Sequence, residues 1–176
     1  MVHLPLAFAL LLWLSTYGYG AVLLVVALES MGVPAPGETV LLAAAITAGT
    51  TRVLSLPLVI GAAAGGAVLG DNLGYWIGTT GGARLLLRYG YLVRINERKL
   101  KLGLVLFQQH GGKVVFFGRF VTVLRMWAAW LAGIYHLRWT RFLWCNALGG
   151  LLWATSYGLG GYLLGTTVYR LTGPLG

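Results

Sequence analysis

Charged residues are scarce in this sequence, and acidic residues are the scarcest of all. Of the 176 residues 10% are charged and 58% are hydrophobic, and 4 Asp and Glu stand against 13 Lys and Arg. A soluble domain has about 25% charged and about 45–50% apolar residues. The composition therefore excludes an ordinary soluble domain and predicts a single membrane domain over residues 1–176.

Cysteine is nearly absent too, and the motifs of common membrane enzymes are missing. The single cysteine, Cys145, allows no intramolecular disulfide and fits no metal-ligand spacing. No histidine or cysteine with an adjacent base lies in the apolar segments, and no phosphatase or ATP-binding motif is present. We therefore expect no metal, no cofactor and no catalytic residue.

Long hydrophobic runs make up most of the chain. A helix needs about 20 residues to cross a hydrocarbon core of about 30 Å. Runs of at least this length predict about three full transmembrane helices in an all-α fold, at residues 4–28, 56–81 and 142–165.

Two further apolar segments do not fit a simple span. Residues 40–49 are too short and follow Pro34 and Pro36, which prevent a continuous helix. Residues 114–134 are interrupted by two arginines. We predict two opposed re-entrant hairpins, at about residues 33–52 and 113–137. In the alternative, residues 114–134 cross the membrane completely.

Basic residues gather in segment 84–113, which we expect to be cytoplasmic and to include an amphipathic helix at the headgroups. Together with Arg138 and Arg141, this segment sets a charge bias that predicts a cytoplasmic N-terminus and an external C-terminus. Because the basic residues flank apolar segments, they favour anionic lipid headgroups over nucleic acid. The segment holds one acid, Glu97, beside Arg84, Arg88, Arg94, Arg98, Lys99, Lys101 and Lys113.

Glycine is abundant and regularly spaced. Gly70, Gly74 and Gly78 share one helix face, which allows close approach of another helix or of a second copy in a homodimer. Gly37-Glu38 precedes Asp71 by 34 residues, counted from the glycine, and Gly112-Lys113 precedes Asn146 by the same interval. A hairpin then precedes a span in each half, which predicts an inverted repeat with a site near the midplane.

Four of the ionisable residues interrupt apolar sequence. Glu29, Glu38, Arg119 and Arg125 stand where the neighbouring residues indicate hydrocarbon. Such a residue costs roughly 2.5–3.5 kcal/mol on insertion scales, and it usually faces a cavity used by ions or substrates. The pattern predicts a membrane transporter.

At these positions the sequence resembles the DedA family, also called the VTT or SNARE-associated family. The matching motifs run in family order from residue 29 to about residue 155. Two positions differ from the family pattern, since Thr122 stands where a proline is usual and Thr79 where an arginine is common. The motifs are Glu29…Pro34-x-Pro36-Gly37-Glu38, Gly70-Asp71-x-x-Gly74-Tyr75-x-x-Gly78, His110-Gly111…Gly118-Arg119-Phe120…Arg125, Ala132-Gly133 and Asn146…Gly149…Trp153.

The resemblance implies two opposed re-entrant hairpins and movement of lipids across the bilayer. Bacterial members of such families are associated with recycling of undecaprenyl phosphate and with phospholipid translocation coupled to protons. We therefore expect a multi-pass protein of the cell inner (plasma) membrane that acts as a flippase for phosphate-bearing lipids. Its partners would be those lipids and a coupling ion.

The chemistry of the buried charges suggests their roles. Arg119 and Arg125 can bind a phosphate bidentately if a break between them lets both converge, or they can neutralise nearby acids or reach the membrane surface. Glu38 and Glu29 can carry the coupling proton or form salt bridges with these arginines, and Asp71 is open to either role. We expect supporting positions at Pro34, Pro36, Gly37, Gly74 and Asn146, the last bonding a hairpin backbone.

Other functions remain open at this point. An uncoupled lipid scramblase and a membrane scaffolding protein are the main alternatives to a coupled transporter. A lipid phosphatase or acyltransferase ranks lower, because the sequence offers no nucleophile with a base beside it.

Overall fold

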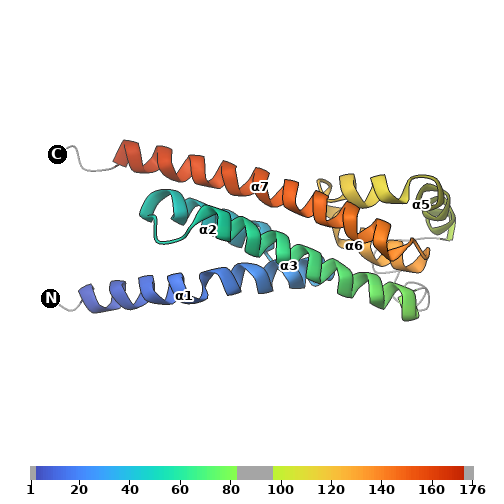
Figure 1. Ribbon diagram of the computed structural model, residues 1–176, viewed down its shortest axis with the longest axis horizontal. Helices are drawn as coiled ribbons and strands as arrows, with labels where there is room; N and C mark the ends of the chain where they lie inside the picture. The colour runs from blue at the N-terminus through green and yellow to red at the C-terminus, as the bar shows by residue number, and fades with distance from the viewer. Residues whose placement is uncertain (1–2, 83–96, 173–176) are drawn as a thin grey trace.

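The computed structural model describes residues 3–82 and 97–172, and all regular structure in these ranges is helical, as the sequence predicts. The helices form one elongated bundle (Figure 1). They are α1 (His3–Ser30), α2 (Gly37–Thr51), α3 (Leu56–Ile77), the π-helix η1 (Gly78–Gly82), α5 (Glu97–Gly118), α6 (Thr122–Ile134) and α7 (Trp139–Thr172).

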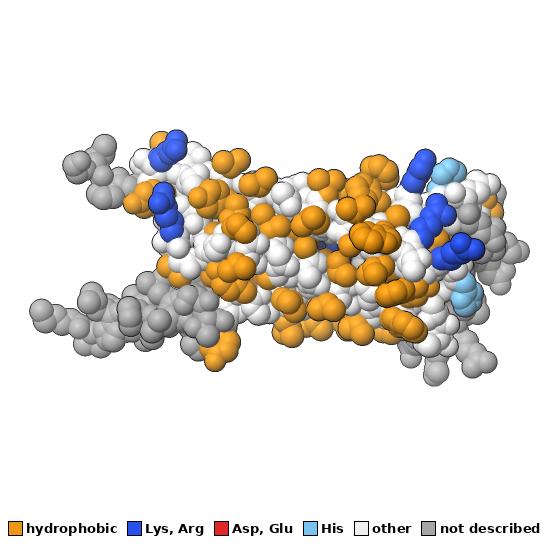
Figure 2. Space-filling view, in the orientation of Figure 1, with side chains coloured by type: hydrophobic (Ala, Val, Ile, Leu, Met, Phe, Trp, Pro, Cys, Tyr) orange, Lys and Arg blue, Asp and Glu red, His pale blue; other side chains and the backbone are white. Residues whose placement is uncertain are grey.

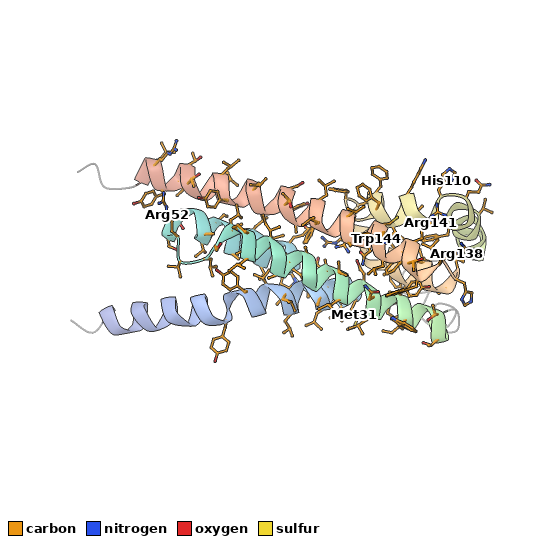
Figure 3. The ribbon with its side chains drawn as sticks, in the orientation of Figure 1. Met31, Arg52, His110, Arg138, Arg141 and Trp144 are labelled. Atoms are coloured by element: carbon orange, nitrogen blue, oxygen red, sulfur yellow. The ribbon has the colours of Figure 1, made fainter. Side chains whose placement is uncertain are left out.

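The first two helices form an antiparallel pair. The prolines at 34 and 36 end helical structure between them, and Met31, in their connection, lies between the two ends of the molecule (Figure 3). Near this connection α2 begins against Val26 of α1. Beyond the other end of α2, the backbone N–H of Ser55 donates to the Tyr19 hydroxyl at 2.8 Å. These contacts bring both ends of α2 against α1.

A second antiparallel pair, α5 and α6, enters from the opposite end of the bundle (Figure 1). The chain reverses after Gly118, where the N–H of Phe120 donates to Phe117 O and that of Val121 to Gly118 O, both at 3.1 Å. Farther out, the rings of Phe107 and Tyr135 lie 5.4 Å apart and join the two arms. Each pair is followed by a long helix, α3 after the first and α7 after the second.

The first pair differs from its predicted bounds. Residues 33–52 comprise only the connection and α2, and the other arm is α1, which the sequence assigned to a separate span at 4–28. Residues 113–137 comprise the end of α5, the turn and α6. The repeat also aligns differently, because Gly37 begins α2 whereas Gly112 lies inside α5. Glu38 is the second residue of α2 and Arg125 the fourth residue of α6, so both charges lie in the first turn of their helices.

The helix ends are grouped differently from the predicted sidedness of the chain. The N-terminus and segment 84–113 were expected to share the cytoplasmic side, with the C-terminus opposite. Instead, α1 begins and α7 ends at one end of the molecule, and η1 and the start of α5 lie at the other (Figure 1). The reason is that α1 turns back into α2. Arg84, Arg88 and Arg94 lie outside the described residues, so the predicted amphipathic helix is described only from Glu97 onward.

Glycines let the helices approach closely, as the sequence predicts. A Cβ at Gly70 would lie 2.8 Å from the carbonyl carbon and 2.9 Å from the Cα of Ala27 in α1. Farther along the same helix, Gly74 faces the indole of Trp130, and a Cβ at Gly78 would lie 3.1 Å from the Cα of Gly133. The spaced glycines of α3 and η1 thus allow close contact first with α1 and then with α6.

Two apolar clusters fill the bundle. The first joins α1, α2, α3 and α7 and contains Val22, Leu41, Ala63 and Trp153. The second joins α3, α5, α6 and α7 around Tyr75, whose ring stacks on Phe142 at 4.7 Å. On α3, Asp71 lies between the members of the two clusters, so the boundary between them falls at a charged residue.

The surface carries a band of exposed hydrophobic side chains between two ends that bear arginines (Figure 2). Among the described residues, the helical stretch Leu56–Gly81 is long and apolar enough to cross a membrane by itself. It matches the predicted span at 56–81. The distribution of side chains is typical of a protein whose long axis crosses the bilayer.

Two alanine substitutions on α3 test the glycine contacts. Gly70→Ala forces α3 away from the backbone of α1, and we expect it to lower the free energy of unfolding by about 1–3 kcal/mol. Gly65→Ala on the same helix is the control, because a Cβ there meets nothing within 4 Å. It should be neutral or stabilising by up to about 1 kcal/mol. Unfolding in mixed micelles measures both, and equal effects would contradict the packing.

Candidate functional site

Arg119 is the centre of a buried polar cluster between the two apolar clusters. Its guanidinium forms an ion pair with Asp71 of α3, and its Nη2 donates to Oδ1 of Asn146 in α7 at 2.5 Å. The three residues are 3%, 5% and 1% exposed, respectively. Because an unpaired buried charge is costly, these contacts explain how Arg119 can be buried.

Arg125 is held by two carboxylates from the first helix pair. Its Nη1 donates to Glu38 Oε1 at 2.8 Å, and its Nη2 pairs with Glu29. The guanidinium carbon also lies 5.0 Å from the ring centroid of Trp153, in cation–π geometry. Arg125 is buried, whereas the side chain of Glu38 is 33% exposed. Glu38 is therefore the more accessible of its two acidic partners.

The helix ends place these groups. Glu29 lies in the last turn of α1, Glu38 in the first turn of α2 and Arg125 in the first turn of α6. The reversal between α5 and α6 is the break that two arginines six residues apart need in order to converge. The tips of both helix pairs therefore meet through charged side chains.

Both arginines line one small cavity. Its volume is about 10 Å³, roughly what one water molecule occupies. Three of the lining residues carry polar atoms without a hydrogen-bond partner in the described part of the chain: Asp71 Oδ1, Arg119 Nη1 and Asn146 Nδ2. The cavity thus offers both donors and an acceptor to an incoming polar group.

The ionisable groups of the site do not balance. Three carboxylates, those of Glu29, Glu38 and Asp71, stand against the two guanidinium groups, so the fully ionised set has a net charge of −1. Uptake of one proton would neutralise it.

The predicted supporting residues have different surroundings. Pro34 and Pro36 are exposed in the connection, whereas Gly37 is buried. A Cβ on Gly37 would lie against the Glu29 carboxylate, 3.2 Å from its carboxyl carbon and 3.3 Å from the Cα of Val26. Asn146 accepts from the Arg119 side chain and not, as predicted, from a hairpin backbone.

Two tryptophans contact the site without a role there predicted from the sequence, although Trp153 stands in one of the family motifs. Trp153, which is 1% exposed, covers Arg125. Trp130 faces Gly74, and its Nε1 donates to the carbonyl of Met31 at 2.8 Å, which joins α6 to the connection of the first pair. The spacing of Trp153 from Asn146, seven residues on one helix, was the available signal, because it puts both on one face.

Known proteins resemble this chain over most of its length. The family model described as the VTT domain matches residues 34–163. An uncharacterised membrane protein of Synechocystis sp. is 45% identical over 152 residues, 86% of this chain and 69% of that protein. Protein DedA of Escherichia coli is 29% identical over 139 residues, 74% of this chain and 60% of that protein. Undecaprenyl phosphate transporter A of Bacillus subtilis is 27% identical over 157 residues, 89% and 77% of the two chains. No solved structure matches the chain.

A double-mutant cycle tests the buried pair of Arg119 and Asp71. Asp71→Leu leaves a buried guanidinium without its carboxylate, and we expect a loss of about 3–5 kcal/mol in the free energy of unfolding. Adding Arg119→Met removes the stranded charge, so the double variant should recover most of that loss. Unfolding in mixed micelles measures the cycle, and simple additivity of the two single losses would contradict the pairing.

Gly37→Ala tests the geometry of the site without altering any charge. The added methyl displaces the Glu29 carboxylate from Arg125, while Glu38 keeps its contact. We expect a loss of stability of about 1–2 kcal/mol, largely absent when Glu29→Ala is already in place. The same unfolding assay measures it, and an undiminished loss in the double variant would argue against the contact.

Proposed function

The chain belongs to the VTT domain family, as its motifs predicted, and we propose that it moves phosphate-bearing lipids across the membrane. The observation that carries the proposal is the convergence of two buried arginines, both paired with carboxylates, on one cavity at the tip of the second helix pair, where α3 and α7 also line it. The proposed roles are phosphate binding for Arg119 and Arg125 and proton transfer for Glu38, Glu29 and Asp71.

Phosphate and carboxylate compete for the same guanidinium groups. A guanidinium presents a planar set of donors that fits either anion bidentately. An arriving lipid phosphate takes over the contacts that Glu38 and Glu29 make to Arg125 and reaches the free Nη1 of Arg119. The displaced carboxylates then lack a positive partner in a low-dielectric setting, which favours their protonation.

Charge balance makes proton coupling a natural part of this exchange. The empty site already has a net charge of −1, and a phosphate adds at least one further negative charge. Protons on Glu38 and Glu29 offset that charge, so a proton gradient can drive the lipid. Glu38 leads this role because its side chain is the more exposed of the two.

The helix pairs supply the scaffold for transport. We take them to be re-entrant hairpins that enter from opposite faces and meet near the bilayer midplane, in the inverted arrangement typical of secondary transporters. We place the end that carries Arg138 and Arg141 at the cytoplasmic side, because α5 begins at this end and follows a stretch of sequence rich in arginine. The beginning of α1 and the end of α7 then face outward, and the protein belongs to the inner membrane.

The name of the Bacillus subtilis relative makes undecaprenyl phosphate the first substrate to test, with a phospholipid as the second. Reconstituted protein should move undecaprenyl phosphate across liposomes faster under an imposed pH gradient than without one. An external phosphatase measures translocation, because a lipid that has reached the inner leaflet keeps its phosphate. Equal rates without a gradient would favour an uncoupled scramblase instead.

Isosteric substitution tests the coupling residue. Glu38→Gln keeps a hydrogen-bond acceptor for Arg125 but cannot become negatively charged, so we expect the response to the pH gradient to fall by roughly tenfold or more. Arg52→Gln, at the far end of the molecule, is the control and should transport normally (Figure 3). Normal gradient dependence in a folded Glu38→Gln protein would remove Glu38 from the coupling role.

A further inference from the structure

A second basic site lies at the end of the bundle where α6 passes into α7. An open groove of about 640 Å³ is formed by α5, the α6–α7 connection and the start of α7. Its lining includes Arg138, Arg141 and Trp144, which lie at the same end of the molecule (Figure 3). The groove shares no residue with the central cavity.

Among the described residues, no carboxylate offsets the charge of this groove. Within the described part of the chain, Arg138 and Arg141 form no ion pair, whereas Arg119 and Arg125 form three between them. The described lining contains no acidic side chain, and His136 adds a further polar ring. Two arginines beside the first turn of α7 also oppose the helix dipole, so helix stability does not explain their position.

The backbone of the groove is held in an unfavourable conformation. His136 has φ 52°, the left-handed region where glycine is usual. It ends α6 in a Schellman motif, because the N–H of His136 donates to Gly133 O at 3.0 Å and that of Leu137 to Ala132 O at 2.9 Å. This motif fixes the direction in which Arg138 leaves the turn.

Apolar side chains also line the groove. Phe107 and Leu137 line it beside the arginines, and Trp144 is 70% exposed at its edge. From Trp144 an exposed strip continues along the same face of α7 through Leu148, Leu151 and Leu152. An amphiphile with an anionic head fits this combination: its phosphate binds the arginines and its chain lies on the strip.

We propose that this groove binds the phosphate headgroup of a lipid in the adjacent leaflet, as a docking site outside the central cavity. The idea rests on the proposed function, since it supplies the place where the substrate waits before or after it reaches Arg119 and Arg125. Arg141 and Asn146 are five residues apart on α7, which is about 7.5 Å along the helix. The buried ring of Phe142 lines the central cavity next to Arg141 in the chain.

Binding of dioctanoyl phosphatidic acid to the full chain in neutral detergent tests this site. The double variant Arg138→Gln/Arg141→Gln should bind the lipid roughly tenfold or more weakly than the unmodified protein, because two charge-assisted contacts are lost. The matched control is Arg52→Gln/Arg170→Gln, which removes the same charge from exposed positions at the opposite end, where α7 finishes (Figure 1), and should bind normally. Equal weakening in both variants would overturn the site.

Two further measurements separate the possible ligands and the two proposals. Inorganic phosphate should compete poorly, because it cannot use the apolar strip, and displacement of the lipid by an equal concentration of phosphate would overturn the lipid assignment. Trp144→Gln should weaken lipid binding but not phosphate binding. The binding assay does not depend on transport. If the protein transports lipid but the groove variant binds lipid normally, only this inference is overturned. A groove effect in a protein that moves no lipid supports the groove and overturns only the proposed function.

Discussion

Arg125 joins the two halves of this molecule, because its guanidinium binds Glu29 and Glu38 of the first helix pair while its backbone belongs to the second. A charge buried at this depth has no water to stabilise it and must find its partners within the protein. The same holds for Arg119, whose partners Asp71 and Asn146 come from the two long helices. Six side chains on five helices and one turn are therefore positioned by one requirement, that each buried charge has a polar partner. The apolar side chains pack around these six.

The glycines follow from this requirement. Helices can share buried ion pairs only if their backbones lie close enough for short side chains to reach, and Gly70 and Gly37 give that proximity at α1. In lipid the hydrophobic effect adds little to helix association, so close contacts and polar bonds hold the bundle together. The indole of Trp130 illustrates both contributions, since it packs on Gly74 and donates to Met31. Loss of such a contact would loosen the site even though no charge is touched.

Much of this could be predicted from the sequence. Composition indicates a membrane protein, and the energetic cost of buried charge singles out Glu29, Glu38, Arg119 and Arg125 as a set. The sequence cannot decide which acid meets which arginine, because that depends on where each hairpin tip stops. The sequence also gives no sign that α1, the helix over the predicted span at 4–28, packs against α2 and contacts Arg125. The predicted sidedness of the N-terminus rests on that one span.

Arginine has two distinct settings in this protein, and their difference gives transport a physical logic. Arg138 and Arg141 are exposed and unpaired in the described structure, so an anion binds them without displacing anything. Arg119 and Arg125 are buried and occupied, so an anion binds them only by exchange with carboxylates. A lipid phosphate that moves from the exposed arginines to the buried ones brings its negative charge into an enclosed site that already holds carboxylates. This transfer is unfavourable unless protons enter with the phosphate. In the proposed mechanism the need for protons thus arises at the step between the two sites, and it does not depend on which lipid tail the phosphate carries.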